Sequence, residues 1–331
     1  MNKSFADLPK VVLVIVTWNH SKTVADTIES VYRQSFNNFT LVVHDNNSTD
    51  GTIDVLKRYE NYPNFVLSAS DLNEGFCGGN NLIISKYDFD YLLLVNPDII
   101  MYPDYLENAL STFKSDPSIG AVCGLLIQSE VVNPVIDSAG MSLMKDRRFC
   151  LNFHGKKLGD VSIKSGFVHG LDGALPLFKR EAVDQLLLNG YFFNPLFFSH
   201  KEDWDISWRM LLFGWKIYFN ANAIAIHPRG FKPNNIKERG KINPKVKYDA
   251  FKNQFILILI NDDKWNFLKD LFHIVPRLIL ITLYCFLNER KSLRAYSYIY
   301  KNRKEIFSYR RLVQQKRKIS PSEFRKFYLS E

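Results

Sequence analysis

The first 130 residues alternate between two hydrophobic periods, and this alternation constrains the fold more than any other feature of the 331-residue chain. Continuous apolar runs predict buried strands over residues 11–17, 39–44, 64–68, 91–95 and 119–127. Apolar residues at helical spacing predict helices between them, over residues 23–33, 52–59, 80–87 and 104–113. Regular strand–helix alternation predicts right-handed βαβ units, and therefore an α/β fold with an open, mostly parallel sheet.

The pattern changes after Gln128. Residues 129–175 lack helical periodicity and predict irregular strands and loops. Helices are predicted over 179–188 and 202–213, and two short strands over 216–219 and 223–227. From Val246 onward the chain is predicted to be largely helical. We therefore predict two units, residues 1–228 and a C-terminal extension of residues 229–331.

The charge follows the same division. The formal net charge is +9, but residues 229–331 hold 24 Lys and Arg against 9 Asp and Glu, a net of +15. Residues 1–228 are therefore left with a net of −6. With 46% hydrophobic residues, the chain can bury a large core, which excludes a disordered protein. The basic excess indicates that an anionic partner binds the last third of the chain and not the rest.

Cysteine spacing and apolar runs bear on the compartment. The four cysteines (Cys77, Cys123, Cys150 and Cys285) show no close pairing or metal-ligand spacing, which favours a reduced, cytosolic setting. No signal peptide is recognisable at the N-terminus. The longest apolar stretch, residues 271–287, is interrupted by His273, Pro276 and Arg277 and falls short of the roughly 20 residues of a span. We expect a cytoplasmic protein that contacts the membrane surface.

Polar residues follow the predicted strands, at the edge where open α/β sheets bind ligands. They occupy positions 17–19, 45–51, 71–81 and 96–98. The carboxylate of Asp45 can accept the imide N–H of uracil or thymine, or can simply belong to a turn before the next helix. Gly75, Gly78 and Gly79 can let backbone N–H groups approach a diphosphate, although paired glycines also form ordinary loops.

Three further positions carry candidate chemistry. Asp98 offers the hard oxygen ligand that Mg²⁺ or Mn²⁺ prefers, unless Asn96-Pro97-Asp98 is only a turn. The carboxylates of residues 202–205 begin a helix after an aromatic run, so they either stabilise the helix dipole or include a general base with a raised pKa. His227 ends an apolar strand and is a candidate nitrogen ligand for a metal.

Taken together, these segments resemble the inverting glycosyltransferases of family 2. The resemblance spans about residues 11–230, with the motifs in family order. They are V-T-W-N (16–19), D-N-N-S-T-D-G-T (45–52), N-E-G-F-C-G-G-N-N (73–81), L-L-V-N-P-D (93–98), G-A (173–174), E-D-W-D-I-S-W-R (202–209) and H-P-R-G (227–230). The N-P-D form looks most like the rhamnosyltransferase-type branch. The resemblance implies a GT-A fold, which is a Rossmann-like open sheet flanked by helices, with a C-terminal helical extension.

The resemblance also implies a role for each matching residue. Asp203 would be the base that takes the proton of the acceptor hydroxyl, and Glu202 would help to place the acceptor. Asp98 and His227 would hold Mg²⁺ or Mn²⁺ on the diphosphate. Asp45 would bind the pyrimidine, beside Thr17 and Asn19. The other implied contacts to the nucleotide sugar are Trp18, Asn73, Gly75, Gly79, Asn80, Asn96, Asp172, Gly173 and Arg209.

Three departures from the family pattern bear on function. Asn96 replaces the first acid of the usual D-x-D, which weakens the expected metal site. Residues 190–194 lack the usual acids and the stretch after His227 lacks the usual serine, which leaves the acceptor open. The resemblance implies an inverting, metal-dependent transferase that uses dTDP-rhamnose, or else another dTDP- or UDP-sugar, in cell-surface polysaccharide assembly such as O-antigen or capsule. A non-catalytic module that binds sugar nucleotides or glycans is the alternative.

The basic last third has two interpretations. An apolar stretch followed by a cationic, aromatic segment is typical of a membrane-surface anchor, which would suit a glycan or polyprenyl-diphosphate-linked acceptor at the inner face of the cytoplasmic membrane. The other interpretation is a helical cap on the core with a solvated basic face. Nucleic acid is a poorer partner, because it would leave the acidic strand-end motifs unexplained.

Overall fold

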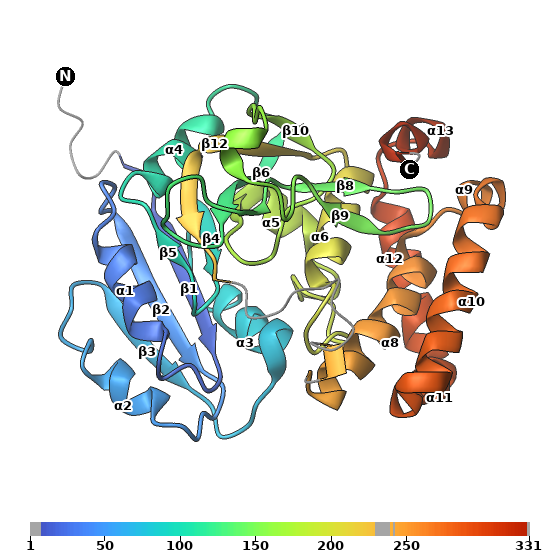
Figure 1. The fold of residues 1–331 in the computed structure, drawn as a ribbon, viewed down its shortest axis with the longest axis horizontal. Coiled ribbons are helices and arrows are strands. Elements are labelled where there is room, and N and C mark those ends of the chain that lie inside the picture. Colours follow the sequence, from blue (N-terminus) through green and yellow to red (C-terminus); the bar gives the residue numbers. More distant parts are fainter. Residues whose placement is uncertain (1–7, 229–238, 241, 330–331) are drawn as a thin grey trace.

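The computed structural model describes residues 8–228, 239–240 and 242–329. Within them, a ten-stranded sheet runs in the order β10-β12-β6-β11-β4-β1-β2-β3, with β5 paired to β12 and β7 to β6 (Figure 1). Its strands are β1 (Val11–Thr17), β2 (Phe39–Asp45), β3 (Phe65–Ala69), β4 (Tyr91–Val95), β5 (Ile100–Met101), β6 (Ile119–Ile127), β7 (Ile136–Ser138), β10 (Gly166–Val168), β11 (Leu177–Lys179) and β12 (Lys216–Ile226). A separate hairpin joins β8 (Met141–Leu143) to β9 (Phe149–Leu151).

The five strands predicted in the first 130 residues are all present, and the predicted α/β class is confirmed. β1 pairs in parallel with β2 on one side and with β4 on the other, so the strand order reverses at β1. Such a reversal leaves a crevice at the carboxyl ends of the two flanking strands, where ligands bind in α/β proteins. One arrangement was not predicted: β11 runs antiparallel between β4 and β6.

Helices cover both faces of the sheet and continue beyond it (Figure 1). Those of the first two thirds are α1 (Val24–Tyr32), α2 (Thr52–Lys57), α3 (Gly75–Ile84), α4 (Tyr105–Thr112), α5 (Arg180–Leu186) and α6 (Glu202–Leu212). The last third forms α8 (Pro244–Asn261), α9 (Lys264–Lys269), α10 (Leu271–Asn288), α11 (Arg294–Lys301), α12 (Arg303–Lys316) and α13 (Pro321–Phe324). The predicted helical character of the last third is therefore confirmed for its described residues.

Side chains of β1 divide between two cores, because successive residues of a strand point to opposite faces. Leu13 and Ile15 pack with the apolar faces of α1 and α4. Val14 and Val16 pack in the larger core, to which the last third contributes Ile256, Leu257, Ile260, Ile306 and Val313. The C-terminal helices thus share the core of the first two thirds.

Two predicted boundaries were wrong. The strands predicted over 216–219 and 223–227 form the single strand β12, which is irregular between Asn220 and Ile224 where its register with β6 shifts. The helix predicted over 80–87 begins earlier, at Gly75, and ends at Ile84. Glycine lowers helix propensity, which concealed the first turn of α3 in the sequence.

Packing explains the glycines of α3. Gly75 has a φ of +77°, and a Cβ there would collide with the carbonyl oxygen of Phe198. A Cβ on Gly79 would lie 2.8 Å from Val16 Cγ1 and 3.0 Å from His44 Cδ2. The glycine-rich segment therefore lets a helix approach β1 and β2 closely.

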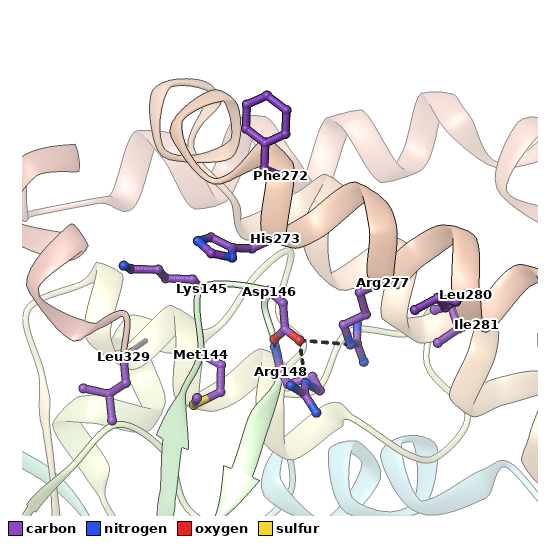
Figure 2. A pocket seen from close by; sticks show the side chains of 10 residues that line it. All are labelled: Met144, Lys145, Asp146, Arg148, Phe272, His273, Arg277, Leu280, Ile281 and Leu329. Atoms are coloured by element: carbon purple, nitrogen blue, oxygen red, sulfur yellow. Dashed lines mark hydrogen bonds and ion pairs between the residues drawn. The ribbon is translucent and has the colours of Figure 1, made fainter. Parts of the chain in front are cut away.

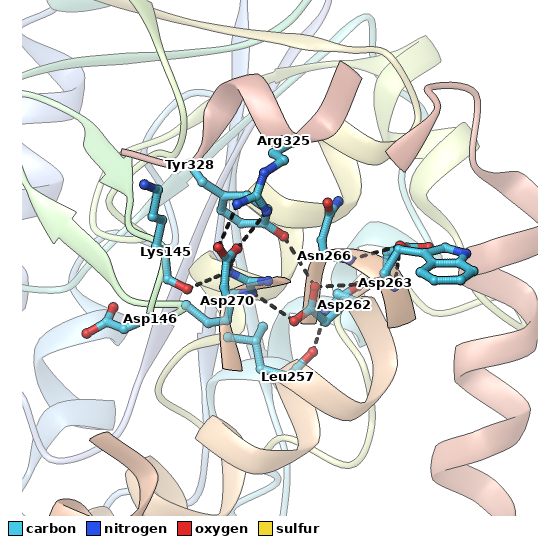
Figure 3. A network of polar contacts seen from close by, with 12 residues as sticks. Lys145, Asp146, Leu257, Asp262, Asp263, Asn266, Asp270, Arg325 and Tyr328 are labelled. Carbon is cyan, nitrogen blue, oxygen red and sulfur yellow. Dashed lines mark hydrogen bonds and ion pairs between the residues drawn. The ribbon is translucent and has the colours of Figure 1, made fainter. Parts of the chain in front are cut away.

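A buried polar network joins the last third to the β8–β9 turn (Figure 3). Arg147 is fully buried, and its Nε and Nη1 donate to Asp262 and Asp270 at 2.8 Å each. Arg325 donates to both oxygens of Asp270, and the ring of Tyr328 lies 4.0 Å from the Arg147 guanidinium. The turn and the C-terminal helices are therefore held together by charge as well as by apolar packing.

Helix α10 differs from the prediction for residues 271–287. It has 18 residues with a mean hydropathy of 1.7, so by length and composition alone it could cross a membrane. Of its side chains, only Ile274 and Cys285 are buried. The helix continues through His273, Pro276 and Arg277, and Arg277 lies 3.5 Å from Asp146 as an ion pair.

Candidate active site

A cavity of about 540 Å³ lies at the carboxyl edge of the sheet. Among the residues that line it are six predicted for the site: Asn96, Asp172, Gly173, Glu202, Asp203 and His227. They come from the end of β4, the segment before β11, the start of α6 and the end of β12. The topology therefore brings together positions that are up to 131 residues apart in the chain.

Asp203 is held at the wall of this cavity by two backbone groups. Its Oδ1 accepts from the N–H of Trp204 at 2.8 Å, and its Oδ2 accepts from the N–H of Gly173 at 3.4 Å. Burial, followed by the charge of Asp172, raises the pKa of Asp203 to about 7. A carboxylate with a pKa near neutrality can accept a proton and release it again, as a general base must.

Glu202 lies beside Asp203 in the same wall. Burial, followed by the charge of Asp203, raises the pKa of the Glu202 carboxyl, and its Oε2 is buried without a hydrogen-bond partner. The two neighbouring carboxyls cannot both ionise cheaply, so near neutral pH one of them tends to hold a proton. The pair can thus present a carboxylate and a carboxylic acid to one ligand.

Asp98 and His227 face each other, with 3.7 Å between Asp98 Oδ1 and His227 Nε2. The other ring nitrogen, Nδ1, lies 2.8 Å from Oδ2 of Asp137, which is fully buried in β7. Burial lowers the pKa of His227, but the hydrogen bond to Asp137 and the charges of Asp172 and Asp98 outweigh it, so the pKa lies above its usual value.

This arrangement fits a divalent cation. A carboxylate that orients the far nitrogen of a histidine is the usual outer-shell partner of a metal-binding imidazole. An oxygen and a nitrogen ligand together suit Mn²⁺ better than Mg²⁺. In the described part of the chain, no group of three or more His, Cys, Asp or Glu side chains is placed to hold a metal. A cation between Asp98 and His227 would therefore need further oxygen ligands from outside the protein.

The loops after β1 and β2 lie against each other. Asn19 accepts from the N–H of Thr49 through its side chain, and its own N–H donates to Ser48 Oγ, at 2.8 Å each. Thr17 is buried and lies 3.3 Å from His20 Nδ1, while Trp18 is 46% exposed. Burial lowers the pKa of His20, and the charges of Asp98 and Asp50 oppose this shift.

Asp45 ends β2 opposite Thr17. Its Oδ2 accepts from the N–H of Ser48 at 2.9 Å, whereas its Oδ1 is buried without a partner. The turn interpretation therefore accounts for one oxygen of Asp45 and leaves the other available to a donor. A buried acceptor without a donor costs free energy, which makes Asp45 the best candidate on this side for binding a polar ligand.

The α3 residues have structural contacts that account for them. Asn73 Oδ1 accepts from the N–H of Gly75, and Asn80 Nδ2 donates to the carbonyl of Phe76. Gly75 and Gly79 are buried against Phe198 and against β1 and β2. Packing therefore explains the two glycines without a ligand, and their contact with a sugar nucleotide stays a prediction.

The prediction for Arg209 was wrong. Its side chain is fully buried, bound to Asp205 and to the carbonyl oxygens of Leu186 and Phe192. Asp205 and Arg209 are four residues apart on α6, so they form an ion pair along one face of the helix. This fully buried guanidinium does not line the cavity, and it supports α6 from behind.

Several residues of the site were not predicted. Asp137 lies on the three-residue strand β7, where the sequence shows no periodicity. Phe76, Ser199, His200, Val246 and Lys247 also line the cavity. The position of Ser199 and His200, three and two residues before Glu202, could have indicated them. Arg229 and Gly230, the end of the H-P-R-G motif, lie outside the described residues.

Comparison with known proteins identifies the sequence pattern. The family model described as "Glycosyl transferase family 2" matches residues 12–187, a little over half of the chain. The poly-beta-1,6-N-acetyl-D-glucosamine synthase of Staphylococcus aureus (strain COL) is 24% identical over 221 residues, which are 66% of this chain and 50% of that protein. The synthase of the same name from Staphylococcus epidermidis is 22% identical over 214 residues, 64% of this chain and 48% of its own. The chain thus spans about half the length of the curated relatives it matches.

Solved structures share the fold. The mannosyltransferase PcManGT from Pyrobaculum calidifontis, in complex with GDP-Man and Mn²⁺, superposes with a TM-score of 0.56 at 17% identity, over 94% of this chain and 85% of that one. A structure of GalNAc-T7 with UDP, GalNAc and Mn²⁺ gives a TM-score of 0.59 at 15% identity, over 77% of this chain and 49% of that one. Both likenesses support the GT-A architecture.

Proposed function

The chain belongs to glycosyltransferase family 2, and we propose that it transfers a sugar from a nucleoside-diphosphate donor to a hydroxyl of a glycan or lipid-linked acceptor, with inversion. One observation carries the proposal. Asp203, with a pKa raised to about 7, lines the same cavity as His227, whose Nε2 lies 3.7 Å from Asp98. A base for the incoming hydroxyl and a site for the leaving diphosphate are thus combined.

The described residues divide the reaction between two sides of the cavity. Asp203 takes the proton of the acceptor hydroxyl while the hydroxyl oxygen attacks the anomeric carbon of the donor sugar. Glu202, beside it, can donate a hydrogen bond to the acceptor when it holds the shared proton. Asp45 offers a free carboxylate oxygen to the imide of a pyrimidine base. Asp98 and His227 would hold Mg²⁺ or Mn²⁺, which supplies positive charge to the leaving diphosphate.

Two donors are favoured by different observations. The Asn96-Pro97-Asp98 form of the metal motif favours dTDP-rhamnose. The relatives named as synthases of poly-N-acetylglucosamine favour a donor that carries N-acetylglucosamine, such as a UDP-sugar. In both cases the nucleotide is a pyrimidine, which Asp45 can bind. We infer a role in polysaccharide assembly at the cell surface.

A panel of nucleotide sugars tests the proposal. Thermal unfolding of the full chain with dTDP-rhamnose, UDP-N-acetylglucosamine and GDP-mannose, each with and without Mn²⁺, should show stabilisation by one pyrimidine donor. Release of the nucleoside diphosphate then measures turnover. Asp203→Asn should keep the stabilisation and lose the turnover. A non-catalytic binding module would instead show the same stabilisation with no turnover in the wild-type protein.

We also propose that the protein works at the inner face of the cytoplasmic membrane. Helices α9 and α10 expose a set of large apolar side chains, namely Trp265, Leu268, Phe272, Ile279, Leu280, Leu283, Phe286 and Leu287. They belong to the basic last third, since residues 229–331 carry a net charge of +15. An amphipathic helix with basic neighbours binds anionic lipid surfaces.

Vesicle sedimentation tests this contact. The wild-type chain should sediment with vesicles that contain phosphatidylglycerol and much less with pure phosphatidylcholine. Replacing Phe272 and Leu283 by Glu should abolish binding, whereas Val132→Glu, at a fully exposed position of the body, should not affect it. Equal sedimentation of both variants would contradict the proposal. If alkaline carbonate does not extract the bound protein from the vesicles, α10 spans the bilayer instead.

A further inference from the structure

Three neighbouring cavities of the protein form a series in which each cavity shares lining residues with the next. The active-site cavity shares Arg239 and Ala250 with a second cavity of about 440 Å³. The second shares Arg277, Leu280 and Ile281 with a third, of about 720 Å³. Figure 2 shows this third cavity between the β8–β9 turn and α10. The series leads from Asp203 to the exposed apolar side of α10.

Two partly buried cationic side chains, Lys201 and Arg277, line the second cavity and share one hydrogen-bond acceptor. Lys201 Nζ donates to Gln254 Oε1 at 2.8 Å, and Arg277 Nη2 donates to the same oxygen at 3.4 Å. Burial, followed by the charge of Arg277, holds the pKa of Lys201 well below its usual value. Two cationic groups that share one neutral oxygen disfavour each other's charged form, and an anion bound beside them would favour it.

Two buried donors beside these cations have no acceptor among the described residues. Arg277 Nη1 is buried without a hydrogen-bond partner, and so is Nε2 of Gln254, a residue that is 1% exposed. The nearby carboxylate of Asp146 is shared, since it lies 3.5 Å from Arg277 Nε and 2.6 Å from Arg148 Nε (Figure 2). The carboxylate of Glu289 pairs with Arg239. Buried donors without acceptors are rare in proteins, and here they point to an anionic ligand.

The walls next to this cluster are apolar. Leu280 and Ile281 line both the second and the third cavity, and Phe272 lines the third. Leu280 is 66% exposed and Phe272 is 90% exposed, so the apolar wall continues onto the outer face of α10. A ligand that fits both parts carries a phosphate at one end of a hydrocarbon chain.

We propose that Lys201, Gln254 and Arg277 bind the phosphate of a membrane lipid that carries the acceptor sugar. The hydrocarbon chain would leave over Phe272 and Leu280, and the sugar would enter the active-site cavity past Arg239 and Ala250. The inference rests on the proposed function, which it deepens by naming the acceptor as a lipid-linked phosphosugar. Lys201 lies two residues before the proposed base Asp203. A phosphate bound to Lys201 would therefore lie close to that base.

Binding of farnesyl diphosphate to the full chain tests this site apart from catalysis. Calorimetric titration in EDTA should show binding that is tighter than that of farnesol or of inorganic diphosphate. Arg277→Gln should weaken it at least about tenfold, because a charged hydrogen-bond donor is lost. Leu280→Gln should weaken the binding of farnesyl diphosphate and leave the binding of inorganic diphosphate unchanged. Arg294→Gln, at an exposed arginine of α11, is the matched control and should change neither.

The outcomes separate this inference from the proposed function. Asp203→Asn should bind farnesyl diphosphate normally, and thermal unfolding shows whether each variant is folded. Unchanged affinity in a folded Arg277→Gln variant, or displacement of the lipid by UDP alone, would overturn the inference and leave the transferase proposal standing. Absence of donor binding and turnover in a protein that still binds farnesyl diphosphate through Arg277 would overturn the transferase proposal instead.

Discussion

At the residue scale, the adjacent carboxyls of Glu202 and Asp203 determine how activity depends on pH. The pKa of Asp203 is raised to about 7, first by burial and then by the charge of Asp172. A general base works only when unprotonated, so kcat/KM should rise as the pH increases through about 7 and then level off. An ordinary aspartate would give this rise near pH 4.

The substitution Asp203→Asn removes the base and keeps the shape. Turnover should fall by roughly 10²–10⁴-fold, and the residual rate should lose the rise near neutral pH. The rate of nucleoside diphosphate release between pH 5 and 9 measures the turnover and its dependence on pH. If the variant keeps the wild-type pH profile, Asp203 is not the base.

We expect Asp137 to be a positioning residue behind the proposed metal site. It is fully buried and lies 2.8 Å from His227 Nδ1, which leaves Nε2 toward Asp98. Asp137→Asn should weaken Mn²⁺ binding by about 10–100-fold, because the imidazole loses its outer carboxylate. Mn²⁺ titration followed by electron paramagnetic resonance measures this without turnover. Asp160→Asn, at an exposed position, should bind Mn²⁺ like the wild type.

The same residues show which site contacts the sequence can predict. His227 directly follows β12 and Asp98 lies three residues after the end of β4, so their shared edge of the sheet could be predicted from hydrophobic runs alone. Asp137 lies on a three-residue strand in a stretch without periodicity, and nothing local indicates that it meets residue 227. Arg209 was misassigned because its motif position indicated a ligand, whereas its four-residue spacing from Asp205 indicated an ion pair within α6.

At the element scale, helix α3 shows how a glycine pattern can indicate packing rather than ligand binding. Gly79 faces Val16 of β1 and His44 of β2 with no room for a side chain. The sequence shows the glycines but not the strand that comes close to them, so a phosphate-binding loop and a tightly packed helix have the same local pattern. Only the position of α3 over β1 and β2 separates the two.

Gly79→Ala tests the packing role. Its Cβ would lie 2.8 Å from Val16 Cγ1 and 3.0 Å from His44 Cδ2, so the helix must move away from the sheet. The free energy of unfolding should fall by about 1–3 kcal/mol, as in other overpacked cores. Gly166→Ala has open space around the added Cβ and should change stability little. Urea unfolding compares the two, and equal stability would show that α3 tolerates a side chain at residue 79.

At the scale of the whole molecule, the two units predicted from charge and composition share one core. Residues 1–228 carry a net charge of −6 and residues 229–331 a net of +15, which indicated a body and a separate attachment. Yet Ile256, Ile306 and Val313 pack in the same core as Val14. Surface charge indicates what a segment binds but does not mark a folding unit. The sequence could therefore suggest a partner for each part, but it could not show that the two parts share a core.

Arg147 tests whether the molecule unfolds as one unit. It is fully buried, and Asp262 and Asp270 of the last third meet its guanidinium from the other side of the interface (Figure 3). Arg147→Met should lower the free energy of unfolding by about 3–5 kcal/mol, because Asp262 is left buried without its cation. Arg180→Met removes an exposed arginine that pairs with Asp88 and Asp184, and should cost less than about 1 kcal/mol. Calorimetry should show a single transition in all three proteins, and two separate transitions would mean that the basic third folds on its own.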